Sequence, residues 1–278
     1  MHSSLVPPRH VPIGDAATFV GTTPETIRRY HEIGLLPDAD RGGEERRYGY
    51  EDMIRLLWIQ KMVDAGIALD DIHDALADAA PASAASGRDA AVVQRMRTVE
   101  GRLSLLSDFV TDRLKGLPEG WLRQTDLDNL LVGERFFGPL GAAVSAGSYI
   151  TMATHPDLRE ESDRLDAAEK ALDDTVAVDD PRVAQVAAER HAFNLALDDV
   201  IDESGLAQSN EALVDSWEAL HPATADEGED DASQGAGSGE KCVSLIDAIG
   251  MMPYDYSPAQ LHCMELVQEL AAGESPVS

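Results

Sequence analysis

Residues 13–30 read IGDAATFVGTTPETIRRY, and this stretch decides the fold of the first quarter of the chain. Its first eight residues place apolar side chains on one helix face, and Gly21 then permits a tight turn. Thr23 is suited to cap a second helix that has Pro24 at its first position. The pattern therefore predicts a helix, a tight turn and a second helix.

The second of these helices has two chemically different sides. At about 100° per residue, Ile27 and Tyr30 lie near one side, and Arg28 and Arg29 lie on the other. We expect packing to bury the first side and to leave both arginines outward. Forked guanidinium donors suit guanine edges and phosphates in the major groove, so this helix is typical of DNA recognition.

A basic segment and a second helix pair follow. Arg46-Arg47-Tyr48, after a polar turn with Gly42-Gly43, predicts a small hairpin or wing that faces the DNA backbone. Two further helices are expected over residues 52–62 and 69–76, with a turn at Gly66. The candidate DNA contacts are Thr23, Thr26, Arg28, Arg29, Tyr30, Arg46, Arg47 and Tyr48.

Five blocks in this region resemble the MerR family of bacterial transcription regulators. That family has an Ile-Gly-Glu-Ala-Ala-like start, a Thr-Leu-Arg-Tyr-Tyr-Glu recognition helix, a Gly-Leu-Leu turn, a Gly-Tyr-Arg-x-Tyr wing and a Gly-x-Ser-Leu-x-x-Ile helix. The same order here is Ile13-Gly14-Asp15-Ala16-Ala17, Thr26-Ile27-Arg28-Arg29-Tyr30-His31, Gly34-Leu35-Leu36, Glu44-Glu45-Arg46-Arg47-Tyr48 and Gly66-Ile67-Ala68-Leu69-Asp70-Asp71-Ile72. Arg29 replaces the first tyrosine, His31 replaces the glutamate, and Glu44-Glu45 replace the Gly-Tyr of the wing.

The resemblance implies a winged helix-turn-helix domain over residues 11–80 and a homodimer. Each subunit would place its recognition helix in the major groove of a near-palindromic promoter site in double-stranded DNA. Activators of the family bend and untwist the promoter so that RNA polymerase can engage both of its elements. Promoter DNA, a second copy of the chain and RNA polymerase are therefore the implied partners.

Residues 88–115 are expected to form one long dimerisation helix. A narrow apolar stripe runs along it and suits pairing with another helix in a coiled coil. An alternative is that the same stripe packs within the chain's own core. The residues of this predicted seam are Val93, Met96, Val99, Leu103, Leu106, Val110 and Leu114.

Residues 116–278 are expected to form an all-helical effector domain. Gly116-Leu117-Pro118 breaks the preceding helix, and helical periodicity returns over residues 158–172, 181–201 and 261–270. Residues 222–240 are rich in Asp, Glu, Gly and Ser, a composition that predicts a mobile acidic loop. The fold class expected for the whole chain is mainly α.

Charge limits how the chain can bind DNA. The 278 residues carry a formal net charge of −29, which opposes general attraction to nucleic acid. Residues 1–75 hold 8 basic and 13 acidic side chains, and the remainder holds 14 and 38. DNA binding must therefore depend on a few well-placed arginines in the first quarter.

The sequence indicates an organic ligand rather than a metal for the effector half. Metal-sensing relatives place cysteines close together just past the dimer helix, whereas Cys242 and Cys263 are 21 residues apart and far downstream. No metal site and no cofactor are predicted. Aromatic residues that could line a pocket, although such residues more often form plain core, are Trp121, Phe136, Phe137, Tyr149, Phe193 and Trp217.

A ligand-independent regulator, or an interaction module whose acidic C-terminal half contacts a protein partner, is the alternative. No phosphate loop, nucleophile elbow or metal-hydrolase spacing is found, so we do not expect an enzyme. Two cysteines and the lack of an apolar span predict a cytoplasmic protein that does not enter the membrane.

Overall fold

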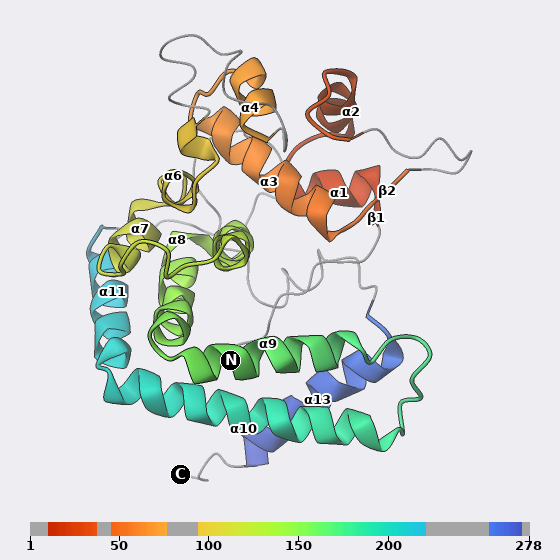
Figure 1. The fold of residues 1–278 in the computed structure, drawn as a ribbon, viewed down its shortest axis with the longest axis vertical. Helices are drawn as coiled ribbons and strands as arrows, with labels where there is room; N and C mark the ends of the chain where they lie inside the picture. Colours follow the sequence, from red (N-terminus) through yellow and green to blue (C-terminus); the bar gives the residue numbers. More distant parts are fainter. Residues whose placement is uncertain (1–10, 38–45, 77–93, 221–255, 274–278) are drawn as a thin grey trace, which may run out of the picture.

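The computed structural model describes residues 11–37, 46–76, 94–220 and 256–273, and it is mainly helical over these ranges (Figure 1). Helices α1 (Ile13–Val20) and α2 (Pro24–Glu32) confirm the predicted helix-turn-helix. Gly21 ends α1 in the left-handed region, at a φ of 82°. The Thr23 hydroxyl accepts a hydrogen bond from the backbone N–H of Thr26 at 3.2 Å and caps α2.

The strand that carries Arg47 pairs with the start of the described chain. Strand β1 (Val11–Pro12) runs antiparallel to β2 (Arg47–Tyr48), with Val11 opposite Tyr48 and Pro12 opposite Arg47. The expected local hairpin falls partly on residues 38–45, which lie outside the described residues. The pairing ties the strand that carries Arg47 to the residue that precedes α1.

The second predicted helix pair is also present. Helices α3 (Tyr50–Asp64) and α4 (Leu69–Leu76) flank Gly66, which has a φ of 76°. Arg55 joins the two pairs, because its guanidinium donates to the carbonyls of Leu35 at 2.7 Å and Leu76 at 3.4 Å. Ile27, Leu56 and Ile72 are fully buried between them.

The prediction of a single long helix over residues 88–115 is wrong for residues 94–115, the part of this range that the structure describes. Residues 77–93, including Val93, lie outside the described residues. Beyond them the chain forms two short helices, α6 (Val99–Leu103) and α7 (Asp108–Leu114), separated by a turn. Within this one chain the core buries Met96, Leu106, Val110 and Leu114 and partly covers Val99 and Leu103. A 3.6-residue repeat identifies buried positions but not the surface that covers them, and here that surface belongs to the same molecule.

Helix α8 (Gln124–Thr154) is bent back on itself. Gly138 has φ 68° and ψ 179°, a conformation that only glycine adopts readily, and Pro139 follows it. The two arms of α8, residues 124–137 and 139–154, pack together: a Cβ added at Gly133 would lie 4.0 Å from the Cα of Ala142. The first arm therefore has one side toward the second arm and another toward the helix-turn-helix.

Three of the remaining helices form a second layer, which lies below α8 in Figure 1. Helices α9 (Pro156–Lys170), α10 (Pro181–Glu203) and α13 (Pro258–Gly273) pack together, and α11 (Leu206–Leu220) runs from the end of α10 along α7 and α8. Helices α9, α10 and α13 confirm the expected helical periods. The predicted acidic loop lies outside the described residues. Among the described helices, none has the length and apolar character needed to cross a membrane.

Candidate nucleic-acid interface

Helix α2 presents a polar side to solvent. Ile27 and Tyr30 are buried, at 0% and 4% exposure, and fix the rotation of the helix against α1 and the core. The same rotation leaves Thr23, Arg28 and Arg29 exposed and Thr26 half-buried. The predicted division of this helix into a packed and an exposed side is therefore present in the fold.

Arg28 is exposed and only loosely paired. Its Nη1 lies 3.2 Å from Oε1 of Glu25, one turn earlier, with side-chain exposures of 58% and 77%. A backbone hydrogen bond is the largest influence that lowers the pKa of Glu25, and Arg28 adds to it. Because exposed pairs of this kind contribute little, Arg28 can exchange Glu25 for a phosphate or a base edge at small cost.

Arg46 is held against the recognition helix. Its Nη1 donates to Nδ1 of His31 at 2.8 Å, and its Nη2 donates to the carbonyl of Pro37 at 2.6 Å. The guanidinium carbon also lies 5.3 Å from the ring centre of Tyr48. Nε2 of His31 is hydrogen-bonded to the hydroxyl of Tyr48 at 3.1 Å.

Two of the predicted DNA contacts are wrong. Tyr30 and Tyr48 are 4% and 1% exposed, and burial raises the pKa of both phenols. Both rings fill the core because they face inward from α2 and β2, so neither offers its ring to a duplex. Six of the predicted residues keep an accessible polar group: Thr23, Thr26, Arg28, Arg29, Arg46 and Arg47.

The structure also brings in a residue that the predicted contacts omit. His31 lies on α2 one turn after Arg28 and links that helix to Arg46 of the wing. Arg46 lies over the ring of Tyr48, and the charges of both Arg46 and Arg28 oppose the rise in the pKa of this phenol that burial causes. The signal in the sequence was that His31 occupies a position in the recognition block where the resembling family has glutamate.

The first arm of α8 contacts the helix-turn-helix region through buried groups. Trp58 Nε1 on α3 donates to Oδ1 of Asp128 at 2.6 Å. Lys61 on α3 pairs with the buried Glu134, which also accepts from the backbone N–H of Ser107 at 2.9 Å. Because α8 is an integral part of the core around α3, movement of this arm would disturb the packing of the helix-turn-helix region.

Apolar contacts continue this junction onto α1. The rings of Phe19 and Phe136 meet edge to face, with centres 5.0 Å apart. Arg135 donates through Nε to the carbonyl of Phe19 at 3.1 Å and covers Gly21 at the turn of the helix-turn-helix. One continuous apolar core thus extends from α1 through α3 to α8.

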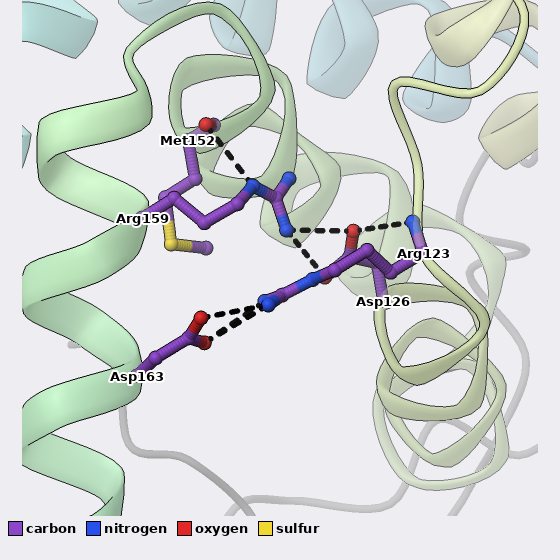
Figure 2. Close-up of polar contacts among 5 residues, drawn as sticks. All are labelled: Arg123, Asp126, Met152, Arg159 and Asp163. Carbon is purple, nitrogen blue, oxygen red and sulfur yellow. Dashed lines mark hydrogen bonds and ion pairs between the residues drawn. The ribbon is translucent and has the colours of Figure 1, made fainter.

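The opposite side of the same arm of α8 carries an ion-pair cluster (Figure 2). Both carboxylate oxygens of Asp126 lie close to Nη1 of Arg159, at 3.1 and 3.0 Å, and Nε of Arg159 donates to the carbonyl of Met152. Arg123 donates its backbone N–H to Asp126 and pairs with Asp163 through its side chain. This Asp126 cluster ties α9 to both arms of α8.

The aromatic residues predicted to line a pocket are dispersed. Phe136 packs on Phe19, Phe193 belongs to a different core with Met152, and Trp217 stacks edge to face on Phe109. Two surface hollows lie elsewhere, one of about 290 Å³ beside His73 and one of about 450 Å³ between α10 and α13. Neither hollow is lined by any of the six predicted residues, which are Trp121, Phe136, Phe137, Tyr149, Phe193 and Trp217.

Within the described ranges, no three His, Cys, Asp or Glu side chains come together as a metal-ion site. Cys263 is buried between α13 and the neighbouring helices, and burial raises the pKa of its thiol to about 11. Cys242 lies outside the described residues.

Comparison with known proteins identifies the family. Residues 11–79 match the model of the MerR HTH family regulatory proteins. The HTH-type transcriptional regulator HmrR of Sinorhizobium medicae is 32% identical over 107 residues, which cover 72% of that protein and 38% of this chain. The chain belongs to the MerR family. No solved protein structure matches it.

Other MerR-family relatives match a shorter part of the chain. The mercuric resistance operon regulatory proteins of Serratia marcescens and Bacillus cereus are 40% and 35% identical over 65 residues. These matches cover 23% of this chain in each case, and 45% and 49% of the relatives. The chain thus spans just under half the length of these MerR-family relatives, and each match covers less than a quarter of the chain.

Proposed function

We propose that this protein is a DNA-binding transcription regulator of the MerR type. The observation that carries the proposal is the side of α2 that leaves Arg28 and Arg29 exposed, with Arg46 joined to the same helix through His31. These cations lie in the first 75 residues, which hold 8 basic and 13 acidic side chains in a chain of net charge −29. The acidic remainder would oppose binding in any orientation other than the one that points α2 at the duplex.

Fluorescence anisotropy tests this proposal with double-stranded DNA taken from the promoter region of the protein's own gene. The expected result is an affinity that falls as salt rises, and that falls by about 1 to 3 kcal/mol in Arg28→Ala or Arg46→Ala if each contact is a bidentate pair. Arg164→Ala is the matched control, because Arg164 is an exposed, ion-paired arginine on α9. Equal binding by all three variants would contradict these assignments.

We infer a homodimer on a near-palindromic site, with deformation of the promoter as the route to RNA polymerase. Val99 and Leu103 are the described members of the predicted seam that the core covers only partly, so they remain available to a second copy. A charge at Leu103 would then be buried in the contact. Light scattering of Leu103→Asp is expected to give a monomer, and a dimer of unchanged mass would refute the contact.

We propose that the effector half responds to a small organic ligand. The support is the path through α8: the Asp126 cluster binds α9 on one side, and Asp128 and Glu134 contact α3 on the other. A ligand that moves α9 would act on both sides of one helical arm. Mercury appears only in the names of relatives that match part of the chain, and we do not propose it as the ligand of this protein.

A thermal-shift screen tests the ligand proposal, because any compound that binds the folded state raises the unfolding midpoint. A hit is expected to change DNA affinity in the wild-type protein. Hits without any effect on DNA affinity would favour the alternative, a ligand-independent regulator or an acidic module that contacts a protein partner. A role on promoter DNA corresponds to a cytoplasmic protein, and we propose that this role is regulatory rather than enzymatic.

A further inference from the structure

The contacts of His31 define its protonation and tautomer. A guanidinium has only N–H donors, so the 2.8 Å contact between Nη1 of Arg46 and Nδ1 of His31 requires Nδ1 to be an unprotonated acceptor. The proton of the neutral ring then lies on Nε2, which donates to the hydroxyl of Tyr48 at 3.1 Å. One imidazole therefore accepts from the wing arginine and donates to a buried phenol.

This arrangement restrains Arg46 at several points. The carbonyl of Pro37 accepts from Nη2, and the ring of Tyr48 lies 5.3 Å from the guanidinium carbon. Tyr48 is 1% exposed and belongs to β2, whose partner strand β1 leads directly into α1. Arg46 is thus held by contacts with the buried part of the helix-turn-helix region, and not only by its own segment of chain.

We propose that His31 is a positioning residue for DNA recognition: as the neutral Nε2–H tautomer, it holds Arg46 beside α2 so that wing and recognition helix meet the duplex in one register. The inference rests on the proposed function, DNA binding. A side chain held in its bound geometry loses less conformational freedom when it binds than a free one does. His31 therefore contributes to affinity without touching DNA itself.

The neutral state of His31 also matters for charge. The resembling family has glutamate at this position, and a carboxylate there would neutralise Arg46 while accepting its hydrogen bond. A neutral imidazole accepts the same bond without cancelling the positive charge of Arg46. In a chain of net charge −29, each cation at the interface counts in the electrostatic part of binding.

Three substitutions separate these roles. His31→Asn keeps an acceptor oxygen near the place of Nδ1 and gives up the Tyr48 contact. His31→Gln reaches the hydroxyl of Tyr48 but gives up Arg46. His31→Glu supplies an acceptor that carries a negative charge. Anisotropy titrations with the promoter DNA, at several salt concentrations, measure all three in the full-length protein beside Arg46→Ala and Arg28→Ala.

We expect His31→Gln to lose about fivefold or more in affinity, a loss within the range of one hydrogen bond to a charged group. His31→Asn should restore binding to within about twofold of wild type. Combining His31→Gln with Arg46→Ala should weaken binding no more than Arg46→Ala alone, because the two residues act as one unit. His31→Glu should lower the slope of log affinity against log salt by about one phosphate contact.

Equal losses in His31→Asn and His31→Gln, or additive losses in the double variant, would overturn the inference, because they indicate a general packing role. Loss of binding in Arg28→Ala with wild-type affinity in His31→Gln overturns this inference alone and leaves the proposed function standing. Absence of salt-dependent binding by the wild-type protein would instead overturn the proposed function, and this inference with it.

Discussion

The indole Nε1 of Trp58 donates a 2.6 Å hydrogen bond to Oδ1 of Asp128, across 70 residues of chain. Asp128 is 9% exposed and also accepts from Gln124 at 2.8 Å. Two residues earlier on the same helical turn, Asp126 binds Arg159 of α9. Two buried carboxylates of one helix therefore join α8 to α3 of the helix-turn-helix region and to α9 of the second layer.

Replacement of Asp128 by Asn should change how stability depends on pH. Burial raises the pKa of Asp128 above its ordinary value, against the opposing effect of the Trp58 and Gln124 hydrogen bonds. A raised carboxyl pKa in the folded state gives stability that is complete below the unfolded pKa, about 3.9, and is lost as pH rises through the folded pKa. Asn keeps an acceptor for Trp58 and does not titrate.

The unfolding free energy of wild type minus that of Asp128→Asn should therefore fall as pH rises above about 4 and then level off. Urea unfolding across this range measures it, with the exposed Asp199→Asn on α10 as the control. Parallel curves for wild type and Asp128→Asn would show that Asp128 has the same pKa in both states.

Lys61 and Glu134 should behave as a coupled pair between α3 and α8. The side chain of Glu134 is 1% exposed and that of Lys61 is 25% exposed. Lys61→Met leaves a buried carboxylate with only the Ser107 N–H, so we expect a loss of about 3 kcal/mol in unfolding free energy. The double variant Lys61→Met/Glu134→Met should be closer to wild type than Lys61→Met alone, and an additive double-mutant cycle would refute the coupling.

The Asp126 cluster should contribute more to stability than an exposed pair on the same helix. Arg159→Ala removes the closer of two guanidinium groups that pair with Asp126, which is only 2% exposed, and leaves Arg123 at 3.6 Å, so we expect a loss of about 2 kcal/mol. Arg164→Ala removes an arginine that is 49% exposed, and the expected loss is under about 1 kcal/mol. Denaturant unfolding compares the two variants, and similar losses would mean that Asp126 finds another partner.

Leu114 should act within one chain rather than between chains. It is 2% exposed in the core that α7 shares with α8, so Leu114→Ala should lower the unfolding free energy by about 2 to 5 kcal/mol. The molar mass in light scattering should stay that of wild type. Leu220→Ala, at a 68% exposed position, is the control. A halved mass with unchanged stability would restore Leu114 to the dimer seam.

Cys263 should be unreactive in the folded protein. Its pKa, raised to about 11 by burial, keeps the thiol protonated at neutral pH, and the thiolate is the reactive form. In a Cys242→Ser background, a chromogenic disulfide reagent should label Cys263 slowly under native conditions and rapidly in denaturant. Equal rates in the two conditions would show an accessible thiol.

Much of the helix-turn-helix could be predicted because its signals are local. Gly21 ends one helix at a positive φ, Thr23 and Pro24 start the next, and the 3.6-residue spacing selects Ile27 and Tyr30 for burial. Each of these depends on backbone geometry and on side chains within a few residues. The outward position of Arg28 and Arg29 follows from the same spacing.

The errors concern surfaces that meet over long distances in the chain. Tyr48 was predicted to contact DNA, but its pairing with Val11 and its bond to His31 turn it inward. Six aromatic residues were grouped as a pocket, yet Phe136 and Phe193 belong to separate cores. The presence of an aromatic residue in the sequence predicts that its side chain is buried, but it does not predict which residues the side chain contacts.

The amino-acid sequence by itself determined which residues form turns, which cap helices and which are buried, because these features depend on residues close together in the chain. It thereby also identified the family and helix α2 as the expected recognition helix. Only the tertiary structure decided that the stripe ending at Leu114 is covered by α8 of the same chain, and that His31 and Arg46 are one unit. The physical reason is that removal of apolar area from water is favourable whichever surface covers it. The surface that a given side chain contacts therefore depends on how the whole core packs.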